Sequence, residues 1–244
     1  MSDGILELGS AGLDSTDQRV RKLMDNIVNS EVPGYKKSDV VITAFPQLLE
    51  QASQKIATMK PQADSTYYNH LNGALVKTGN QLDLALGSDG FFVVNGSWGE
   101  GYTRDGRFLL DNEGRLLSMV GNYPVSGQNG AIVVTPGSKV EFSQQGDVIV
   151  DGSVVDRIRV IDTENKQNLV SINGSFFKVS SNAVNISEVA DPRVIQGYVE
   201  ASNVNIVDSM MEMIYLERQY NINTKVVSTR DGMLGKAMEL GKTN

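Results

Sequence analysis

Apolar residues recur at spacings of three and four along the first part of the chain. The repeating positions, most of them apolar, are Leu6, Gly9, Leu13, Thr16, Val20, Leu23 and Ile27. This spacing predicts a helix over residues 4–29 with one heptad-type seam. Val32-Pro33-Gly34 predicts where it ends, because proline disfavours helical backbone in the residue before it and glycine commonly follows a helix.

A second and longer helix is predicted at the other end of the chain, over residues 203–240. If continuous, it has roughly 36 residues and is about 55 Å long. Its apolar residues fall on two stripes on roughly opposite sides of the helix. The first stripe holds Met210, Met213, Tyr220, Val227, Leu234 and Met238, and the second holds Val207, Met211, Ile214, Ile222, Val226, Met233, Ala237 and Leu240.

Between the helices, residues 81–189 show short apolar runs separated by turn residues. Phe91–Val94 is followed by Asn95-Gly96, and Phe108–Leu110 by the turn cluster Asp111–Gly114. Such turn signals at short intervals predict a compact antiparallel β domain.

The whole chain is therefore predicted to be an α+β protein with a central antiparallel β domain between N- and C-terminal helices paired as a coiled-coil-like domain. The expected segments are 1–34 (N-terminal helix), 35–80 (extended connection), 81–189 (β domain), 190–203 (return linker) and 204–244 (C-terminal helix). Within the connection, Leu48–Met59 fits a short helix and Thr66–His70 an extended segment.

Two apolar stripes on one helix raise the question of what covers them, because a surface helix of a monomer needs only one apolar face. The N-terminal helix can cover one stripe. Other copies of the chain can cover the second, and contacts of this kind that do not close into a ring propagate as a helical filament. The alternative is an ordinary helical hairpin packed on the β domain.

Composition narrows the function. The chain has 244 residues, 40% of them hydrophobic and 21% charged, which suits a folded protein, and its net charge of −7 disfavours nucleic-acid binding. It has no cysteine, and no apolar run approaches the roughly 20 residues needed to span a bilayer. Met1–Ser10 contains Asp3 and Glu7 but no Lys or Arg, so we expect no cleaved signal peptide.

The residues give little support for catalysis. His70 is the only histidine and lies in a polar stretch, so we expect it on the surface. Asp105, Asp111 and Asp151 lie at turns, where aspartate favours the backbone geometry. Asp111–Gly114 lacks the ligand spacing of a calcium loop, and Gly87–Gly90 lacks the Lys and Ser/Thr of a phosphate-binding loop. We predict no enzymatic activity, cofactor or metal; a paired-carboxylate hydrolase is an alternative.

Four residues have expected structural roles. Arg104 and Asp105 are expected to form exposed salt bridges between subunits. Gly34 permits the sharp exit from the first helix. Tyr35 either anchors this turn against a neighbour or is buried in its own subunit.

Three separated segments of the chain resemble one family. Asn26–Lys36 is similar to the N-terminal signature of flagellar rod and hook proteins, with Val28 and Val32 departing from the usual Ala and Thr. Gln196–Asn205 resembles the segment that opens their C-terminal helix, where Ser209 stands at a position that is commonly acidic. Leu82–Leu86, Gly90–Phe92 and Tyr102–Phe108 resemble their β domain.

This resemblance implies a structural axial subunit of the bacterial flagellar rod. Such proteins polymerise into a helical tube that crosses the periplasm and transmits motor torque to hook and filament. The implied partners are copies of the chain, other rod proteins and the flagellar type III export apparatus. The implied location is the basal-body rod, reached without a cleaved signal.

Within the family, the short length and Met233–Lys236 favour the proximal rod, whereas Glu200–Val204 suits the distal rod, the nearest competitor. Another hook-type axial subunit is a further alternative, and a secreted β-rich adhesion or binding module is the alternative from another class. The predicted subunit-interface residues are Leu6, Leu13, Val20, Leu23, Ile27, Gly34, Tyr35, Val207, Met210, Met213, Ile214, Tyr220, Val227 and Leu234.

Overall fold

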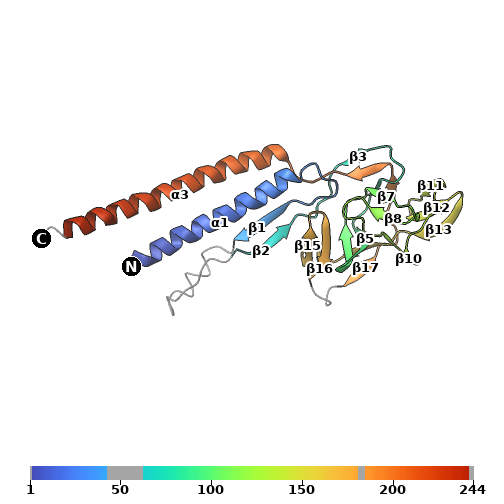
Figure 1. Ribbon diagram of the computed structural model, residues 1–244, viewed down its shortest axis with the longest axis horizontal. Helices are drawn as coiled ribbons and strands as arrows, with labels where there is room; N and C mark the ends of the chain where they lie inside the picture. Colours follow the sequence, from blue (N-terminus) through green and yellow to red (C-terminus); the bar gives the residue numbers. More distant parts are fainter. Residues whose placement is uncertain (1, 43–62, 181–184, 242–244) are drawn as a thin grey trace. The chain divides into compact units, whose positions relative to one another are not determined.

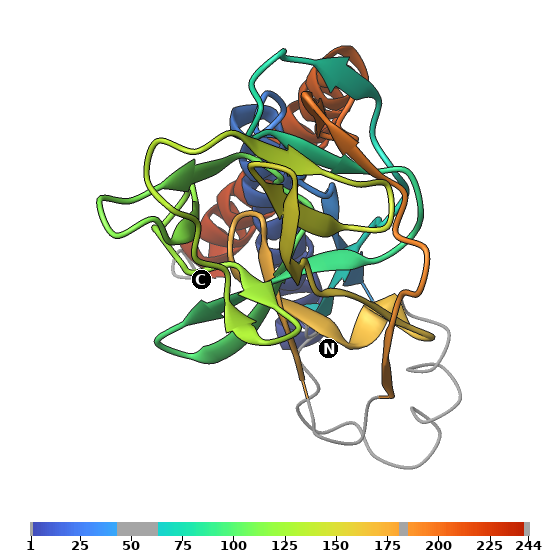
Figure 2. The same ribbon diagram turned by 90° about the vertical axis from the view of Figure 1, so that its right-hand side faces the viewer.

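The computed structural model describes residues 2–42, 63–180 and 185–241. The chain divides into two compact units. The helical unit comprises residues 1–28, 38–68 and 205–244, and the strand unit comprises residues 29–37 and 69–204. Figures 1 and 2 show their elements.

The helical unit contains the two predicted helices. Helix α1 spans Ser2–Val28 and helix α3 spans Ile206–Gly241, with 36 residues. Asn205 begins α3, because its Oδ1 accepts hydrogen bonds from the backbone N–H groups of Val207 and Asp208. The two helices that the sequence periodicity predicted are thereby confirmed.

The two helices pack against each other and run in opposite directions (Figure 1). On α1, Thr16 and Leu23 of the predicted seam are buried. Among the described residues of α3, the buried side chains are Ser209 and Leu216, and Met213 of the first stripe is half-buried beside them. At 100° per residue these positions lie on the side of the first stripe and away from the second. That α1 covers the first stripe stays a prediction, because Val227 and Leu234 lie outside the residues whose side chains the structure describes.

A two-stranded antiparallel ribbon accompanies the helices. Strand β1 (Ser38–Ile42) pairs with β2 (Ala63–Tyr68), which agrees with the extended backbone predicted around Thr66. The buried side chain of Asn26 fixes β1 to α1: its Nδ2 donates to the carbonyl of Ser38 at 2.7 Å, and its Oδ1 accepts from the N–H of Ser38 at 2.9 Å. The short helix predicted over Leu48–Met59 lies outside the described residues.

The strand unit is built from short strands joined by tight turns. Their bounds are β3 (Leu75–Lys77), β4 (Leu84–Leu86), β5 (Phe91–Gly96), β6 (Gly99–Thr103), β7 (Phe108–Leu110), β8 (Leu116–Ser118), β9 (Ser126–Gly127), β10 (Gly130–Ala131), β11 (Val140–Phe142), β12 (Asp147–Val150), β13 (Ser153–Arg157), β14 (Val160–Thr163), β15 (Leu169–Asn173), β16 (Phe176–Val179), β17 (Ile186–Glu188), β18 (Val194–Gln196) and β19 (Tyr198–Glu200), with a 3-10 turn η1 at Lys166–Asn168.

These strands form several small sheets (Figure 2). The largest has the order β15-β16-β6-β5-β14-β17, and a three-stranded sheet has the order β11-β12-β13. Two ribbons bring the end of the unit back to its start: β18 pairs with β4, and β19 pairs with β3. The pairs between these strands are antiparallel, as the turn pattern predicted.

One hydrophobic core holds the strand unit together. Phe92 and Phe108 meet edge to face at a centroid distance of 5.3 Å, and both are buried. Aliphatic side chains from many strands surround them, including Leu84, Val148 and Val194. The core thus places the ends of β6 and β19, which carry the polar groups described next.

Candidate functional site

A buried ion cluster lies in the strand unit around the carboxylate of Glu200, at the end of β19. Lys36 Nζ donates to Glu200 Oε1 at 2.7 Å, and Arg104 Nη1 donates to Oε2 at 3.2 Å. The backbone N–H of Gly73 also donates to Oε1, at 2.9 Å. The three charged side chains are only 1–2% exposed. One carboxylate therefore joins segments that are far apart in sequence.

The neighbouring Asn203 extends this connection by hydrogen bonds alone. Its Nδ2 donates to the carbonyls of Asn69 and Leu71, and its Oδ1 accepts from the N–H of Lys37. Lys36 Nζ also donates to the carbonyl of Leu71, at 2.8 Å. The start of the strand unit, its return segment and the stretch around residue 70 are thereby held together.

Gly34 fits this junction for a steric reason. Its φ is +70°, a conformation that residues with a Cβ rarely adopt, and a Cβ there would overlap the backbone of Arg104 and Asp105. Its N–H donates to the carbonyl of Glu200 at 2.8 Å. The next residue, Tyr35, is 5% exposed in its own chain, which is the second of its two expected roles.

Burial sets the electrostatics of the cluster. It lowers the pKa of Lys36, and the charge of Glu200 and its hydrogen bond oppose that effect. Burial likewise lowers the pKa of Arg104, again opposed chiefly by Glu200. A buried cation is tolerated only when it is paired, so Glu200 is the group that allows both cations to be enclosed.

The prediction that Arg104 and Asp105 form exposed salt bridges between subunits is wrong. Both side chains are buried. Arg104 pairs with Glu200, and Asp105 pairs with Arg107 at 2.7 Å. The turn between β6 and β7 directs both side chains into the strand unit, where they join parts of one chain.

The expected surface position of His70 is also wrong. The ring of His70 meets Phe177 and Phe91 edge-on, at centroid distances of 5.3 and 5.8 Å. Burial, reinforced by the positive charges of Lys36 and Lys166, lowers the pKa of His70 to about 4. The hydrogen bonds of Lys36 and Asn203 to Leu71 hold the adjacent backbone and keep the ring inside.

The aspartates considered for catalysis stabilise turns by hydrogen bonds to the backbone. Asp111 accepts hydrogen bonds from the N–H groups of Glu113 and Arg115 in the β7–β8 hairpin. Asp151 accepts from the N–H of Lys139 and adopts a φ of +49°. Among the described residues, no three His, Asp or Glu side chains gather in a group that could hold a metal ion.

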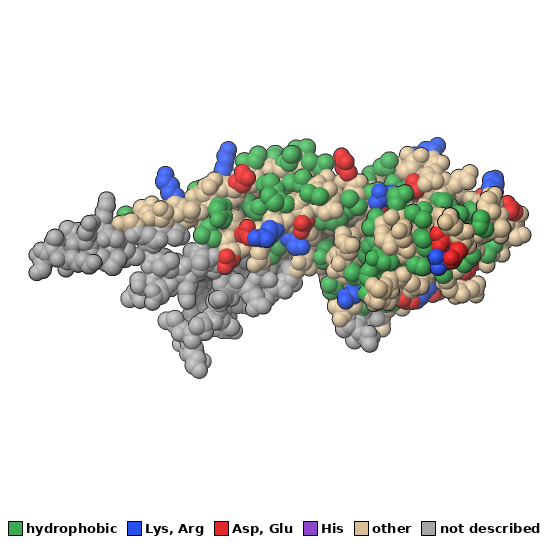
Figure 3. All heavy atoms as spheres, in the orientation of Figure 1, with side chains coloured by type: hydrophobic (Ala, Val, Ile, Leu, Met, Phe, Trp, Pro, Cys, Tyr) green, Lys and Arg blue, Asp and Glu red, His purple; other side chains and the backbone are tan. Residues whose placement is uncertain are grey.

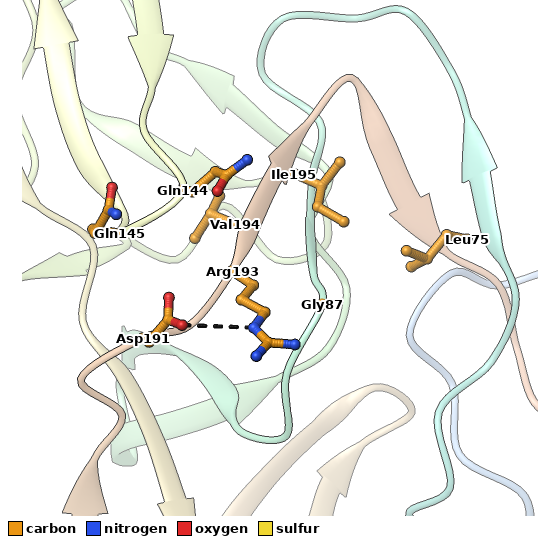
Figure 4. Close-up of a pocket in the computed structure, with 8 residues that line it drawn as sticks. All are labelled: Leu75, Gly87, Gln144, Gln145, Asp191, Arg193, Val194 and Ile195. Atoms are coloured by element: carbon orange, nitrogen blue, oxygen red, sulfur yellow. Dashed lines mark ion pairs between the residues drawn. The ribbon is translucent and has the colours of Figure 1, made fainter.

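An open pocket of about 670 Å³ lies elsewhere in the strand unit (Figure 4). Gln144 and Gln145 line it with Arg193, which pairs with Asp191 at 3.5 Å. These amides and this exposed ion pair can hydrogen-bond to a ligand.

The predicted interface residues of α3 are mostly uncovered in the helical unit. Val207 is 64% exposed, Met210 53%, Ile214 52% and Tyr220 44%, whereas Met213 is half-buried. On α1, Leu23 is buried and Leu13, Val20 and Ile27 are half-buried. Leu6, Val227 and Leu234 lie outside the residues whose side chains the structure describes.

Comparison with known proteins matches two parts of the chain to family models. Residues 195–240 match the model described as "Flagellar basal body rod FlgEFG protein C-terminal". Residues 85–150 match the model described as "Flagellar hook protein FlgE/F/G D1 domain".

Individual relatives match over nearly their whole length. The flagellar basal-body rod protein FlgG of Bacillus subtilis is 27% identical over 95% of this chain and 97% of its own. FlgF of Salmonella typhimurium is 29% identical over 96% of this chain and 95% of its own, and FlgF of Rhizobium meliloti is 27% identical over 91% of each. The chain is a homologue of the flagellar basal-body rod proteins.

The ion cluster of this rod-protein homologue lies across both matched regions. Arg104 falls in the region matched to the D1 domain, and Glu200 and Asn203 fall in the region matched to the C-terminal model. Lys36 comes from the N-terminal segment that resembles the family signature. The three segments that carried the resemblance in sequence thus meet at one carboxylate.

Lys36, Glu200 and Asn203 stand within the sequence motifs, but local pattern predicted no contact for any of them. The signal that could have found them is a charged or amide side chain inside a motif that is otherwise apolar or contains glycine.

Neither described helix of this homologue has the length and apolar character required to cross a membrane.

Proposed function

We propose that the chain is a structural axial subunit of the bacterial flagellar rod, which polymerises into a helical tube and transmits torque from the motor to hook and filament. The observation that carries the proposal is the exposed apolar surface of α3 in a homologue of rod proteins. Val207, Met211, Ile222, Val226 and Met233 are each more than half exposed. Figure 3 shows hydrophobic side chains gathered over the first half of α3.

The size of this surface supports assembly. A water-soluble monomer rarely exposes a contiguous apolar patch without a partner for it. The pairing with α1 buries Ser209 and Leu216 and half-buries Met213, and it leaves the described residues of the second stripe exposed. In the proposed tube, α1 and α3 form a coiled-coil-like pair and neighbouring copies cover the stripes. The exposed members of the predicted interface, Val207, Met210, Ile214 and Tyr220, then lie between subunits.

The remaining parts of the proposal follow from this role. The chain has no catalytic activity, associates with copies of itself and other rod proteins in the basal body, and is exported by the flagellar type III apparatus without a cleaved signal. We place it in the proximal rod. The distal rod is the second candidate, supported by Glu200–Val204.

The test is incorporation into basal bodies purified from the source bacterium. Ile222→Asp places a charge on an exposed apolar stripe and should abolish incorporation without changing the helical circular dichroism of the purified chain. Thr224→Asp, also exposed on α3 but polar already, is the matched control. Normal incorporation of Ile222→Asp would contradict the proposal, and a soluble chain absent from basal bodies would favour an adhesion or binding module.

A further inference from the structure

Four asparagines of this chain, all in the strand unit, are followed directly by a glycine: Asn72, Asn95, Asn129 and Asn173. Such a pair can react with itself, because glycine has no side chain to keep its backbone nitrogen away from the amide carbon of the preceding asparagine. All four asparagines are exposed. Exposure therefore does not distinguish them, and their hydrogen bonds do.

Three of the four asparagine amides are held by a neighbouring side chain. Their Nδ2 atoms donate to an oxygen, from Asn95 to Ser126 Oγ at 2.8 Å, from Asn129 to Asp156 Oδ1 at 3.1 Å and from Asn72 to Asp89 Oδ1 at 3.3 Å. Within the part of the chain that the structure describes, the side chain of Asn173 makes no hydrogen bond.

The glycine that follows each of these three is also held. The N–H of Gly73 donates to Glu200 Oε1 at 2.9 Å. The other two glycines occupy the closing positions of antiparallel ribbons, Gly96 opposite Gly99 and Gly130 opposite Gly127. At such positions the backbone N–H donates across the ribbon and is not free to attack.

Gly174 instead lies inside a turn. Asn173 pairs with Phe176 across the β15–β16 hairpin, so Gly174 and Ser175 form the two-residue turn between them. Gly174 has a φ of +57°, and no described atom outside its chain neighbours lies within 4 Å of a Cβ built there. The first central residue of such a turn donates nothing to the ladder. At Asn173–Gly174 both reacting groups are therefore free.

We propose that Asn173 is a site of spontaneous deamidation. The nitrogen of Gly174 loses its proton to water and attacks Cγ of Asn173; the new N–Cγ bond closes a succinimide ring, the Cγ–Nδ2 bond breaks and ammonia leaves. Water then opens either ring carbonyl and gives aspartate or isoaspartate. The inference is independent of the proposed axial function, because every step uses the strand unit alone.

The product changes the edge of the largest sheet, where β15 is the outermost strand. Both products add a negative charge at the hairpin turn. In isoaspartate the chain also runs through Cβ, which lengthens the backbone between Asn173 and Gly174. The partner position is fixed, because Phe176 is buried and packs edge to face on Tyr123 at 5.4 Å. The longer backbone therefore weakens the pairing of β15.

Peptide mapping by mass spectrometry of the full chain, aged at neutral and at mildly alkaline pH, tests the site. Asn173 should deamidate roughly threefold to tenfold faster than each of the other three, because those must first break hydrogen bonds. In the urea-unfolded chain the four should react at similar rates. Equal rates in the folded chain, or a preference for Asn173 that persists in urea, would overturn the proposal.

Asn173→Gln supplies the matched variant, since the longer side chain forms the ring far more slowly and the position is exposed. The aged natural chain should gain an acidic species in anion-exchange chromatography, and the aged variant should lack it. Backbone hydrogen exchange in β15 should be faster in that acidic species than in the aged variant. An acidic species that accumulates equally in both chains, or equal exchange, would contradict the inference.

Discussion

Lys36 donates a hydrogen bond to Glu200 across 2.7 Å, although 164 positions separate the two residues in the chain. Arg104 shares the same carboxylate. Glu200 thus pairs with two buried cations, Lys36 from the leading segment 29–37 and Arg104 from the main segment 69–204 of the strand unit.

Replacing Glu200 by Gln should destabilise the strand unit strongly. The amide keeps the size of the side chain but leaves Lys36 and Arg104 enclosed without a negative charge, a loss of about 3–5 kcal/mol. Urea unfolding followed by tryptophan fluorescence measures it. Glu188→Gln is the matched control, because its carboxylate pairs with Arg159 at the surface and should change stability by less than about 1 kcal/mol. Equal effects of the two variants would contradict this role of Glu200.

Gly34→Ala should destabilise the chain more than Gly79→Ala. Both glycines have positive φ, +70° and +77°, so each alanine carries backbone strain of about 1 kcal/mol. Only at Gly34 does the added Cβ overlap backbone atoms, whereas nothing lies within 4 Å of it at Gly79. We expect a further loss of about 1–3 kcal/mol at Gly34 in thermal or urea unfolding. A difference near zero would show that the close approach to Arg104 relaxes freely.

His70 should make stability depend on pH between its ordinary pKa of 6.5 and its folded value of about 4. Above this window the ring is neutral in the folded and unfolded chain alike. Within it the unfolded chain binds a proton that the folded chain excludes, so stability falls as pH decreases, by on the order of 2 kcal/mol. His70→Phe should flatten this slope in urea titrations between pH 6.5 and 5. An unchanged slope of stability against pH would show that carboxylates, and not His70, cause this dependence.

Removing residues 205–244 should leave the strand unit folded and abolish assembly. The strand unit ends at Val204, so this deletion retains β18, β19 and Glu200. A longer deletion that begins at residue 194 removes both strands and the shared carboxylate, and should unfold the unit. Circular dichroism and incorporation into basal bodies distinguish the two chains. Incorporation of the shorter deletion would mean that the contacts between copies lie outside α3.

The helices and the turn-rich strand region were predictable because each depends on local pattern. The seam through Thr16 and Leu23 and the turn at Asp111–Gly114 follow from spacing and backbone preference within a few residues. Contacts between residues that are far apart in the chain were not predictable in this way. Arg104 was assigned to the surface because buried charge is uncommon, and only the folded chain reveals that Glu200 accompanies it.

What covers the second apolar stripe of α3 could not be predicted for a related reason. Periodicity locates apolar residues but does not say which partner contacts them. In the helical unit α1 buries Ser209 and Leu216 and half-buries Met213, whereas the described residues of the second stripe remain exposed.

The polar side chains Thr16 and Ser209, buried in the described part of the α1–α3 seam, have a consequence for growth of the proposed rod. A subunit whose own helices hold each other weakly gains most of its order from its neighbours, so early contacts remain reversible. A copy added out of register can then dissociate before the next one arrives. Fidelity of the lattice would come from this correction of errors rather than from tight binding of any single pair.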